Sequence, residues 1–237
     1  MTDPPRSAPI LREFDKKQLS ETVAAYVREA IMVGELRPSA YIRTEHLATQ
    51  LGVSATPVRE ALMILQSEGT VRWEPRRGFR VVPMSRGDVV DLFEVQAFIA
   101  GELAARSATL LPAAEITRLR TVQADLEAAA RAGDTVRVDT LNHEIHRTIN
   151  RAPEAGRLTS MLLMTVHYVP HSYFGRVRGW AEASAHDHDA IFVALENRDA
   201  DGARLAMQGH IRHIGQLLAD HLAAGGAFTQ RHTGSAS

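Results

Sequence analysis

The segment between residues 44 and 82 constrains the fold most, because two short helical patterns are followed at once by an alternating one. Residues 44–51 and 55–65 carry apolar side chains at helical spacing, and a three-residue turn that begins with Gly52 separates them. Apolar residues then recur at every second position on both sides of a turn at 75–78. Two helices joined by a tight turn and followed by a hairpin predict a winged helix-turn-helix.

The capping residues define the limits of these helices. An earlier helix is expected to begin at Ser20, and Thr44 and Ser54 are the expected caps of the two helices that follow. Pro57 lies in the first turn of the third helix, where a missing backbone N–H costs nothing. We therefore expect a domain over residues 15–83 with three helices and a two-stranded wing.

This domain carries polar groups suited to a polyanion. Arg76 and Arg77 lie at the expected wing tip beside Gly78, while Thr56 and Arg59 face outward from the third helix. Guanidinium groups and hydroxyls at the start of a helix are suited to phosphate contacts. The pattern favours DNA binding, and the alternative is a winged helix that binds another protein.

The rest of the chain has only helical patterns, so we expect an all-α second domain over residues 84–228. The tails at 1–14 and 229–237 have the composition of disordered segments. The expected helices of the second domain cover residues 89–108, 113–132, 135–150, 155–169, 180–196 and 199–222.

The composition excludes several classes of protein. With 237 residues, 45% of them hydrophobic and 23% charged, the chain can form a packed core. It has no cysteine, which excludes disulfides, thiolate metal sites and a cysteine nucleophile. The net charge of −1 argues against a generally basic nucleic-acid binder. Neither a signal peptide nor a membrane span is indicated, so we expect a cytoplasmic protein without membrane contact.

Histidine is distributed unevenly. Of eleven histidines only His46 lies in the first third of the chain. Asn142 and His146 are four residues apart and share one helix face, and an antiparallel helix pair would bring His188 near His210. This spacing alone is weak evidence, because a single histidine is more often a packed or surface residue than a metal ligand.

Motifs in both domains, from Gly34–Pro38 to Gly78 in the first and from Leu141–Asn142 to His210 in the second, resemble those of bacterial transcription regulators of the GntR family, in the subclass with an all-helical FCD ligand-binding domain. The second domain is similar through Leu141–Asn142, His146, Asn150, His188–Ile191, Ala194–Leu195, Asp199 and His210. The first domain carries the denser match, in Gly34–Pro38, Leu47–Ala48, Leu51–Ser54, Thr56–Leu62, Glu68–Gly69 and Gly78.

The resemblance implies that the third helix enters the major groove of DNA and that the wing tip reaches the minor groove. Ala55 departs from the family, which commonly has arginine there, so we expect a different or relaxed operator preference. The implied DNA contacts are Thr44, Ser54, Ala55, Thr56, Pro57, Arg59, Arg76, Arg77 and Gly78.

The resemblance also implies a metal site, since metal-binding FCD domains have ligands at the positions of Asn142, His146, His188 and His210. Three imidazoles and an oxygen suit a divalent transition metal, with zinc expected first and nickel or another ion as alternatives. Four neutral ligands leave the charge of the ion uncompensated, which favours a small carboxylate effector. The candidate effector-binding residues are Gln96, Arg106, Arg157 and Arg176.

These features predict a homodimer that binds a palindromic operator and responds to a small organic acid. GntR regulators are most often repressors, so we expect release from the operator when the acid binds. The alternative is a metal-dependent hydrolase or another metalloenzyme built on the helical domain. The run His143-Glu144-Ile145-His146 is superficially similar to a zinc-protease motif, but its histidines are three apart instead of four, which argues against an enzyme.

Overall fold

The computed structural model describes residues 16–166, 177, 179–226 and 228. The chain divides into two compact units, one ending at Met84 and the other spanning Ser85–Gly225. Both tails that the sequence predicts to be disordered, residues 1–14 and 229–237, lie outside the described residues, and so does Arg176.

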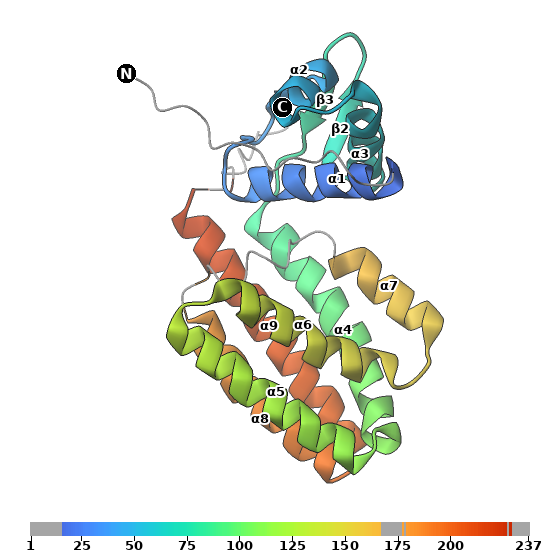
Figure 1. The fold of residues 1–237 in the computed structure, drawn as a ribbon, viewed down its shortest axis with the longest axis vertical. Helices are drawn as coiled ribbons and strands as arrows, with labels where there is room; N and C mark the ends of the chain where they lie inside the picture. Colours follow the sequence, from blue (N-terminus) through green and yellow to red (C-terminus); the bar gives the residue numbers. More distant parts are fainter. Residues whose placement is uncertain (1–15, 167–176, 178, 227, 229–237) are drawn as a thin grey trace, which may run out of the picture. The chain divides into compact units, whose positions relative to one another are not determined.

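The first unit is a winged helix-turn-helix, as predicted (Figure 1). Its core packs buried apolar residues of the three helices against one face of a small antiparallel sheet. Its elements are α1 (Lys16–Met32), β1 (Tyr41–Ile42), α2 (Thr44–Leu51), α3 (Ala55–Ser67), β2 (Val71–Glu74) and β3 (Gly78–Val81).

The sheet has a third strand that the sequence did not indicate. The wing hairpin pairs β2 with β3, and the short β1 pairs with the other edge of β3, with Ile42 opposite Phe79. A strand of two residues has too few positions to show alternation. The pairing fixes the start of α2 against the wing, because only Arg43 separates β1 from that helix.

Two helix starts differ from the predicted ones. The first helix begins at Lys16, so Ser20 lies inside it, buried, and its hydroxyl donates a hydrogen bond to Glu60 of α3 (2.5 Å). The cap of α2 is Arg43, and Thr44 is the buried first residue of the helix. Serine and threonine are common helix-capping residues, but Ser20 and Thr44 are both buried against neighbouring parts of the unit instead.

Gly78 permits the close approach of β1 and β3. Its φ of +95° is in the region that favours glycine, and a Cβ there would lie 2.8 Å from the backbone oxygen of Ile42. Any larger residue would separate the two strands, so this glycine determines how the wing joins the rest of the unit.

The second unit is a bundle of helices, as predicted, and the part of it that the structure describes contains no strand. Helices α8 and α9 are joined by a short turn whose Asp199 caps α9 through the N–H of Gly202 (2.9 Å). The helices are α4 (Arg86–Leu110), α5 (Ala113–Ala132), α6 (Thr135–Arg151), α7 (Gly156–Val166), α8 (Trp180–Glu196) and α9 (Ala200–Ala224).

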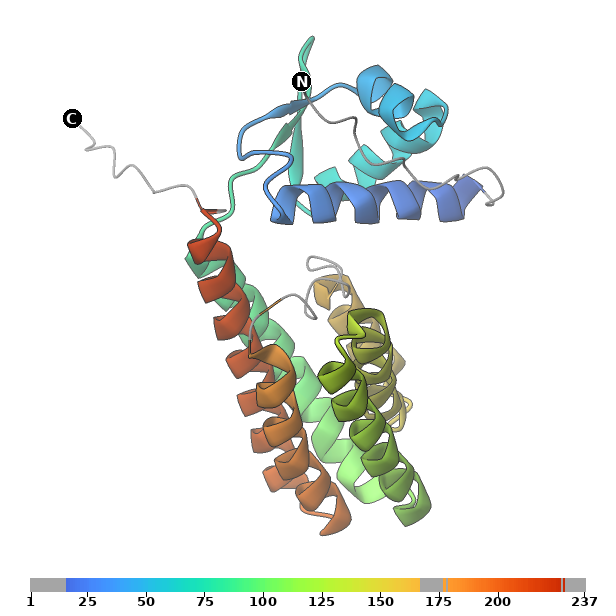
Figure 2. The same cartoon turned by 60° about the vertical axis from the view of Figure 1, so that its left-hand side comes forward.

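Helices α4 and α9 run side by side and antiparallel along the bundle (Figure 2). Three ion pairs connect them at intervals of eight residues: Arg86–Asp220 (2.9 Å), Glu94–Arg212 (2.8 Å) and Glu102–Arg204 (2.6 Å).

The close packing of these two helices depends on Gly215 of α9. A Cβ on Gly215 would lie only 2.4 Å from the Phe93 ring of α4.

Helix α4 begins earlier than predicted, at Arg86, because Ser85 and Asp88 form a reciprocal capping box. Among the described residues, no helix is both long and apolar enough to span a bilayer.

Candidate functional site

A groove in the first unit lies between the start of α2, helix α3 and the wing. Four arginines line it: Arg43, Arg59, Arg76 and Arg77. All four are exposed, so their charges face solvent and are accessible to a polyanion.

Of the DNA-contact residues predicted at the start of α3, only Arg59 lines this groove, and residues 54–57 do not. Ser54 is the cap residue of the helix, and both Ser54 and Thr56 are exposed, while Ala55 is half-buried. Pro57 and Thr44 are buried, so their side chains present little surface to any partner. Arg59 is exposed one turn further along α3 and lies 3.8 Å from Glu45.

The wing tip holds its two arginines differently. Arg76 lies in the turn between β2 and β3 with a left-handed φ of +64°, and its side chain is exposed. Arg77 donates a hydrogen bond to the Tyr41 hydroxyl (3.1 Å), which in turn donates to Glu74 (2.7 Å). Tyr41 of β1 thus orients one of the two wing arginines.

Arg43, Met63 and Trp73 are among the groove residues that the sequence analysis missed. Arg43 immediately precedes the expected cap Thr44, and its basic character next to a helix start was the available signal. Met63 and Trp73 are 60% and 48% exposed. The alternation of β2 places Trp73 on the same face as Val71, and its ring does pack edge-on against its cross-strand partner Phe79, with ring centroids 5.0 Å apart, although the Trp73 side chain stays half exposed.

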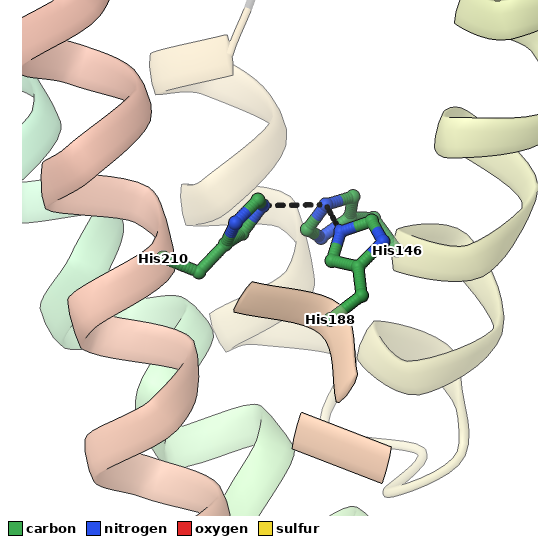
Figure 3. Close-up of side chains that lie close together, drawn as sticks. All are labelled: His146, His188 and His210. Carbon is green, nitrogen blue, oxygen red and sulfur yellow. Dashed lines mark hydrogen bonds between the residues drawn. The ribbon is translucent and has the colours of Figure 1, made fainter. Parts of the chain in front are cut away.

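In the second unit, three histidines from three helices converge on one point (Figure 3). The Nε2 atom of His146 on α6 lies 3.3 Å from Nε2 of His188 on α8 and 3.2 Å from Nε2 of His210 on α9. Nitrogen ligands about 2.0–2.1 Å from a tetrahedral zinc ion are separated by about 3.3 Å. The spacing of these ring nitrogens therefore fits a shared metal ion.

A chain of side chains fixes the tautomer of His188. The Gln123 amide group donates to Glu127 (3.1 Å), so its oxygen is free to accept from Nδ1–H of His188 (2.8 Å). With the proton on Nδ1, the Nε2 lone pair of His188 faces the other two imidazoles. This outer hydrogen bond is the arrangement that metal-ligating histidines commonly have.

Asp187 accepts a hydrogen bond from His210 in the way that Gln123 accepts one from His188. Its Oδ2 lies 3.4 Å from Nδ1 of His210 and 2.9 Å from Nδ1 of His213. The sequence analysis had no residue in this role, although Asp187 directly precedes His188. Asp187 is oriented by a second, exposed histidine and directs Nε2 of His210 toward the cluster.

The surroundings keep the buried imidazoles neutral. Burial, together with the neighbouring His210 and His146, holds the pKa of His188 well below its ordinary value. Burial also lowers the pKa of His210, although Asp187 acts in the opposite direction. Burial raises the pKa of Asp187, but the hydrogen bonds from His210 and His213 outweigh it, so the net shift is downward. Neutral imidazoles have the lone pairs that metal binding requires.

A cavity of about 160 Å³ adjoins the histidines, and Asn142, His146 and His210 are among its lining residues. The Asn142 carboxamide oxygen is buried and accepts no hydrogen bond from any described residue. An orphaned oxygen one helical turn from His146 fits the fourth ligand position that the sequence predicts.

The predicted effector residues have different locations. Gln96 is buried and lines the cavity, where its amide donates to the backbone oxygen of Thr165 (3.0 Å). Arg106 and Arg157 are exposed, and neither is among the cavity-lining residues. The lining arginines are Arg147 and Arg151 instead, which lie on α6 one and five residues after His146.

Comparison with known proteins identifies both units. Residues 19–81 match the family model for bacterial regulatory proteins of the gntR family, and residues 91–213 match the FCD domain. The chain belongs to the GntR family. Among solved structures, this GntR regulator resembles Escherichia coli McbR/YncC, with a TM-score of 0.66 at 23% identity, over 86% of this chain and 98% of that one.

Curated relatives of this GntR protein are transcription regulators. It is 28% identical over 220 residues to the regulator YieP of Escherichia coli K12, covering 83% of this chain and 94% of the relative. It is 27% identical over 206 residues to a protein of Paenarthrobacter nicotinovorans named as a D-xylose utilization operon transcriptional repressor, covering 83% and 88%.

The metalloenzyme alternative finds no support in these relatives, because the GntR protein and its homologues are transcriptional regulators. The geometry of the zinc-protease-like run agrees. Glu144 pairs with Arg118 of α5, and His143 does not belong to the histidine cluster. Neither residue has the position that a zinc-bound substrate would require.

Proposed function

We propose that this GntR regulator is a repressor that binds a palindromic operator and dissociates from it when a small carboxylate binds at a metal ion. One observation carries the proposal: a chain with an arginine-lined winged helix also contains three converging histidines beside a cavity. The repressor assignment is supported by the named xylose-operon repressor among the relatives. Since its target is chromosomal DNA, we place the protein in the cytoplasm.

Ser54, Thr56 and Arg59 at the start of α3 are proposed to contact the major groove, and the wing residues Arg76, Arg77 and Gly78 the minor groove. The buried Thr44 and Pro57 would act through their backbone and helix position. DNA binding is tested by titrating the protein with its own upstream region at several salt concentrations. Each phosphate contact that is removed should reduce the salt slope by about 1, so an R76A/R77A variant should show a smaller slope. Arg37→Ala is the control, because Arg37 is exposed in the same unit but outside the groove.

Ala55 is proposed to relax the operator preference at one base pair. A methyl group can contact thymine but cannot make the bidentate contact to guanine that an arginine makes. Ala55→Arg should therefore add discrimination of about 1–3 kcal/mol in favour of guanine at that step. Selection of bound sequences from a random library measures it, and identical preferences before and after the substitution would exclude the assignment.

Asn142, His146, His188 and His210 are proposed to hold the metal ion, with zinc as the best match to three imidazoles and one oxygen. The ion would supply a fixed positive charge that an anion can bind. Elemental analysis of purified protein should give about one divalent metal per chain. Protein that binds no metal even after loading with zinc, nickel or other divalent ions would refute the site.

The effector is proposed to be an anion because four neutral ligands leave both charges of the ion uncompensated. The cavity lined by Gln96, Arg147 and Arg151 then receives the rest of the molecule. To release DNA, the effector has to bind the DNA-free arrangement more tightly than the DNA-bound one. Footprinting with and without candidate organic acids tests this coupling directly.

A homodimer is proposed because two short recognition helices related by a two-fold axis can read a palindrome. Phe98 on α4 and Leu205 on α9 are large apolar side chains that are 61% and 67% exposed, and a second copy would cover them. Sedimentation should give twice the 26.0 kDa mass of the chain. A monomer at micromolar concentration would contradict the proposal.

A further inference from the structure

The cavity beside the histidines contains a second buried amide that the metal site does not explain. Asn142, His146 and Asn150 are spaced four residues apart, so all three project from one face of α6, and all three line the cavity. The carboxamide oxygen of Asn150, like that of Asn142, is buried and accepts no hydrogen bond from any residue that the structure describes.

A metal ligand role accounts for Asn142 but not for Asn150. Asn150 lies two turns from Asn142, about 12 Å along the helix axis, whereas a metal–oxygen bond is about 2 Å long, so an ion held between Asn142 and His146 is out of reach of Asn150. No described side chain near Asn150 donates a hydrogen bond to its carboxamide oxygen either. The nearby Thr159 hydroxyl donates to the backbone oxygen of Asn150 (3.2 Å) and not to its side chain.

The surrounding wall limits what can satisfy this oxygen. Phe93, Leu162 and Ile214 line the same cavity and have no donor, and the donors that also line it, among them Thr159 and Arg151, make no hydrogen bond to this oxygen. A bound molecule that reaches Asn150 therefore has to bring its own donor. Arg147 and Arg151 also line the cavity, and their positive charges disfavour a donor that is itself an ammonium group.

We propose that Asn150 is a specificity-determining residue that accepts a hydrogen bond from a hydroxyl group of the effector. The effector is then a small hydroxycarboxylate, with its carboxylate at the metal and its hydroxyl at the far end of the cavity. This inference rests on the proposed function, because it takes the metal-bound carboxylate as given. The volume of about 160 Å³ is close to that of a cavity that holds benzene, which limits the molecule to about six to eight non-hydrogen atoms.

The test measures selectivity for the hydroxyl on the zinc-loaded full-length protein. Three pairs of acids serve as probes in calorimetric titrations: 3-hydroxypropanoate with propanoate, 4-hydroxybutyrate with butyrate, and 5-hydroxypentanoate with pentanoate. In at least one pair, the hydroxylated acid should bind about tenfold more tightly than its partner.

Asn150→Leu keeps a similar side-chain volume and removes the acceptor. It should reduce that ratio to about one while leaving the zinc content and the affinity for the unsubstituted acid unchanged. Asn150→Ser, which restores a shorter acceptor, should recover part of the preference. Unchanged zinc content shows that each variant has kept its fold and its metal site.

Affinities that differ by less than twofold in all three pairs overturn the inference, and so does a preference that survives in Asn150→Leu. In those cases zinc and the unsubstituted acids still bind, and the proposed function stands. Protein that takes up no zinc and binds none of the six acids refutes the inference and the proposed function together.

Discussion

The two units of this regulator place their polar groups in opposite environments. In the first unit the arginines of the groove are exposed, and they remain charged in water until a polyanion approaches. In the second unit His188 and His210 are almost completely buried and are kept neutral by their surroundings. A surface for DNA requires charge, whereas a metal site requires lone pairs, and burial supplies the second by suppressing protonation.

The two sites also differ in how many separate parts of the chain supply their residues. The groove is built from a continuous segment between Arg43 and Phe79, so a few neighbouring residues define it. The histidine cluster takes its residues from α6, α8 and α9, and it exists only when the bundle has formed. Perturbing the second site should therefore have larger consequences than perturbing the first.

The largest effect is expected for His188→Ala, which removes a fully buried imidazole of the cluster. Loss of a direct ligand should weaken zinc binding by more than the roughly 10–100-fold that the loss of an outer partner costs. Competition with a chromophoric chelator measures the affinity. His186→Ala is the matched control, since His186 is exposed two residues earlier on α8, and its zinc affinity should equal that of the wild type.

Metal removal should destabilise the second unit and leave the first unchanged. An ion present at about 100 times its dissociation constant stabilises the folded state by about 2.7 kcal/mol. Hydrogen exchange after chelation should therefore accelerate in α6, α8 and α9 but not in α3. Equal acceleration in α3 would show that the two units do not differ in this way.

Asp187→Asn should have a smaller effect, because Asp187 orients His210 without being a predicted ligand. Its loss removes the carboxylate that lies 3.4 Å from His210 and 2.9 Å from His213. Zinc affinity should fall by about 10–100-fold. Asp189→Asn, on the same helix and paired with Arg120 at the surface, should bind zinc normally. A similar loss in both variants would indicate a general effect of charge instead of orientation.

The smallest effect is expected in the first unit, for Tyr41→Phe. The change removes the hydroxyl that accepts from Arg77 but keeps the ring, which lies 5.8 Å from the guanidinium. The hydroxyl also donates to Glu74, and since both hydrogen bonds are exposed, only the lost orientation of Arg77 should affect DNA binding, by about 0.5 kcal/mol or roughly a twofold weaker operator affinity. Fluorescence anisotropy with labelled operator DNA resolves a change of this size, and a tenfold loss would mean that Tyr41 contacts DNA itself.

The sequence predicted those features whose signals are local. The turn at Gly52, the wing and the run of helices follow from spacing and from turn residues, and the structure has all three. The approach of His188 to His210 was predicted from a short connection between antiparallel helices, and their ring centroids lie 4.6 Å apart. Asn142 and His146 share a face simply because they are four residues apart.

Other features could not be predicted because they depend on tertiary contacts. Ser20 has the composition of a cap, but its hydroxyl bonds Glu60, forty residues away in the sequence. The role of Gln123, which is to accept a hydrogen bond from His188, depends on the packing of α5 against α8. Arg106 and Arg157 looked as suitable as Arg147 and Arg151 for the cavity, because the sequence does not show which helix faces point inward.

The packing of Gly215 against Phe93 restricts how an effector could act on the bundle. If α9 slid along α4 by one turn, Ile211 or Ala219 would take the place of Gly215 and put a Cβ where only hydrogen fits. The same shift would break all three salt links between the helices together. Sliding of α9 along α4 is thus blocked, and the two helices should move together as a rigid body. Rearrangement on effector binding is expected instead in α6 and α7, which form the opposite wall.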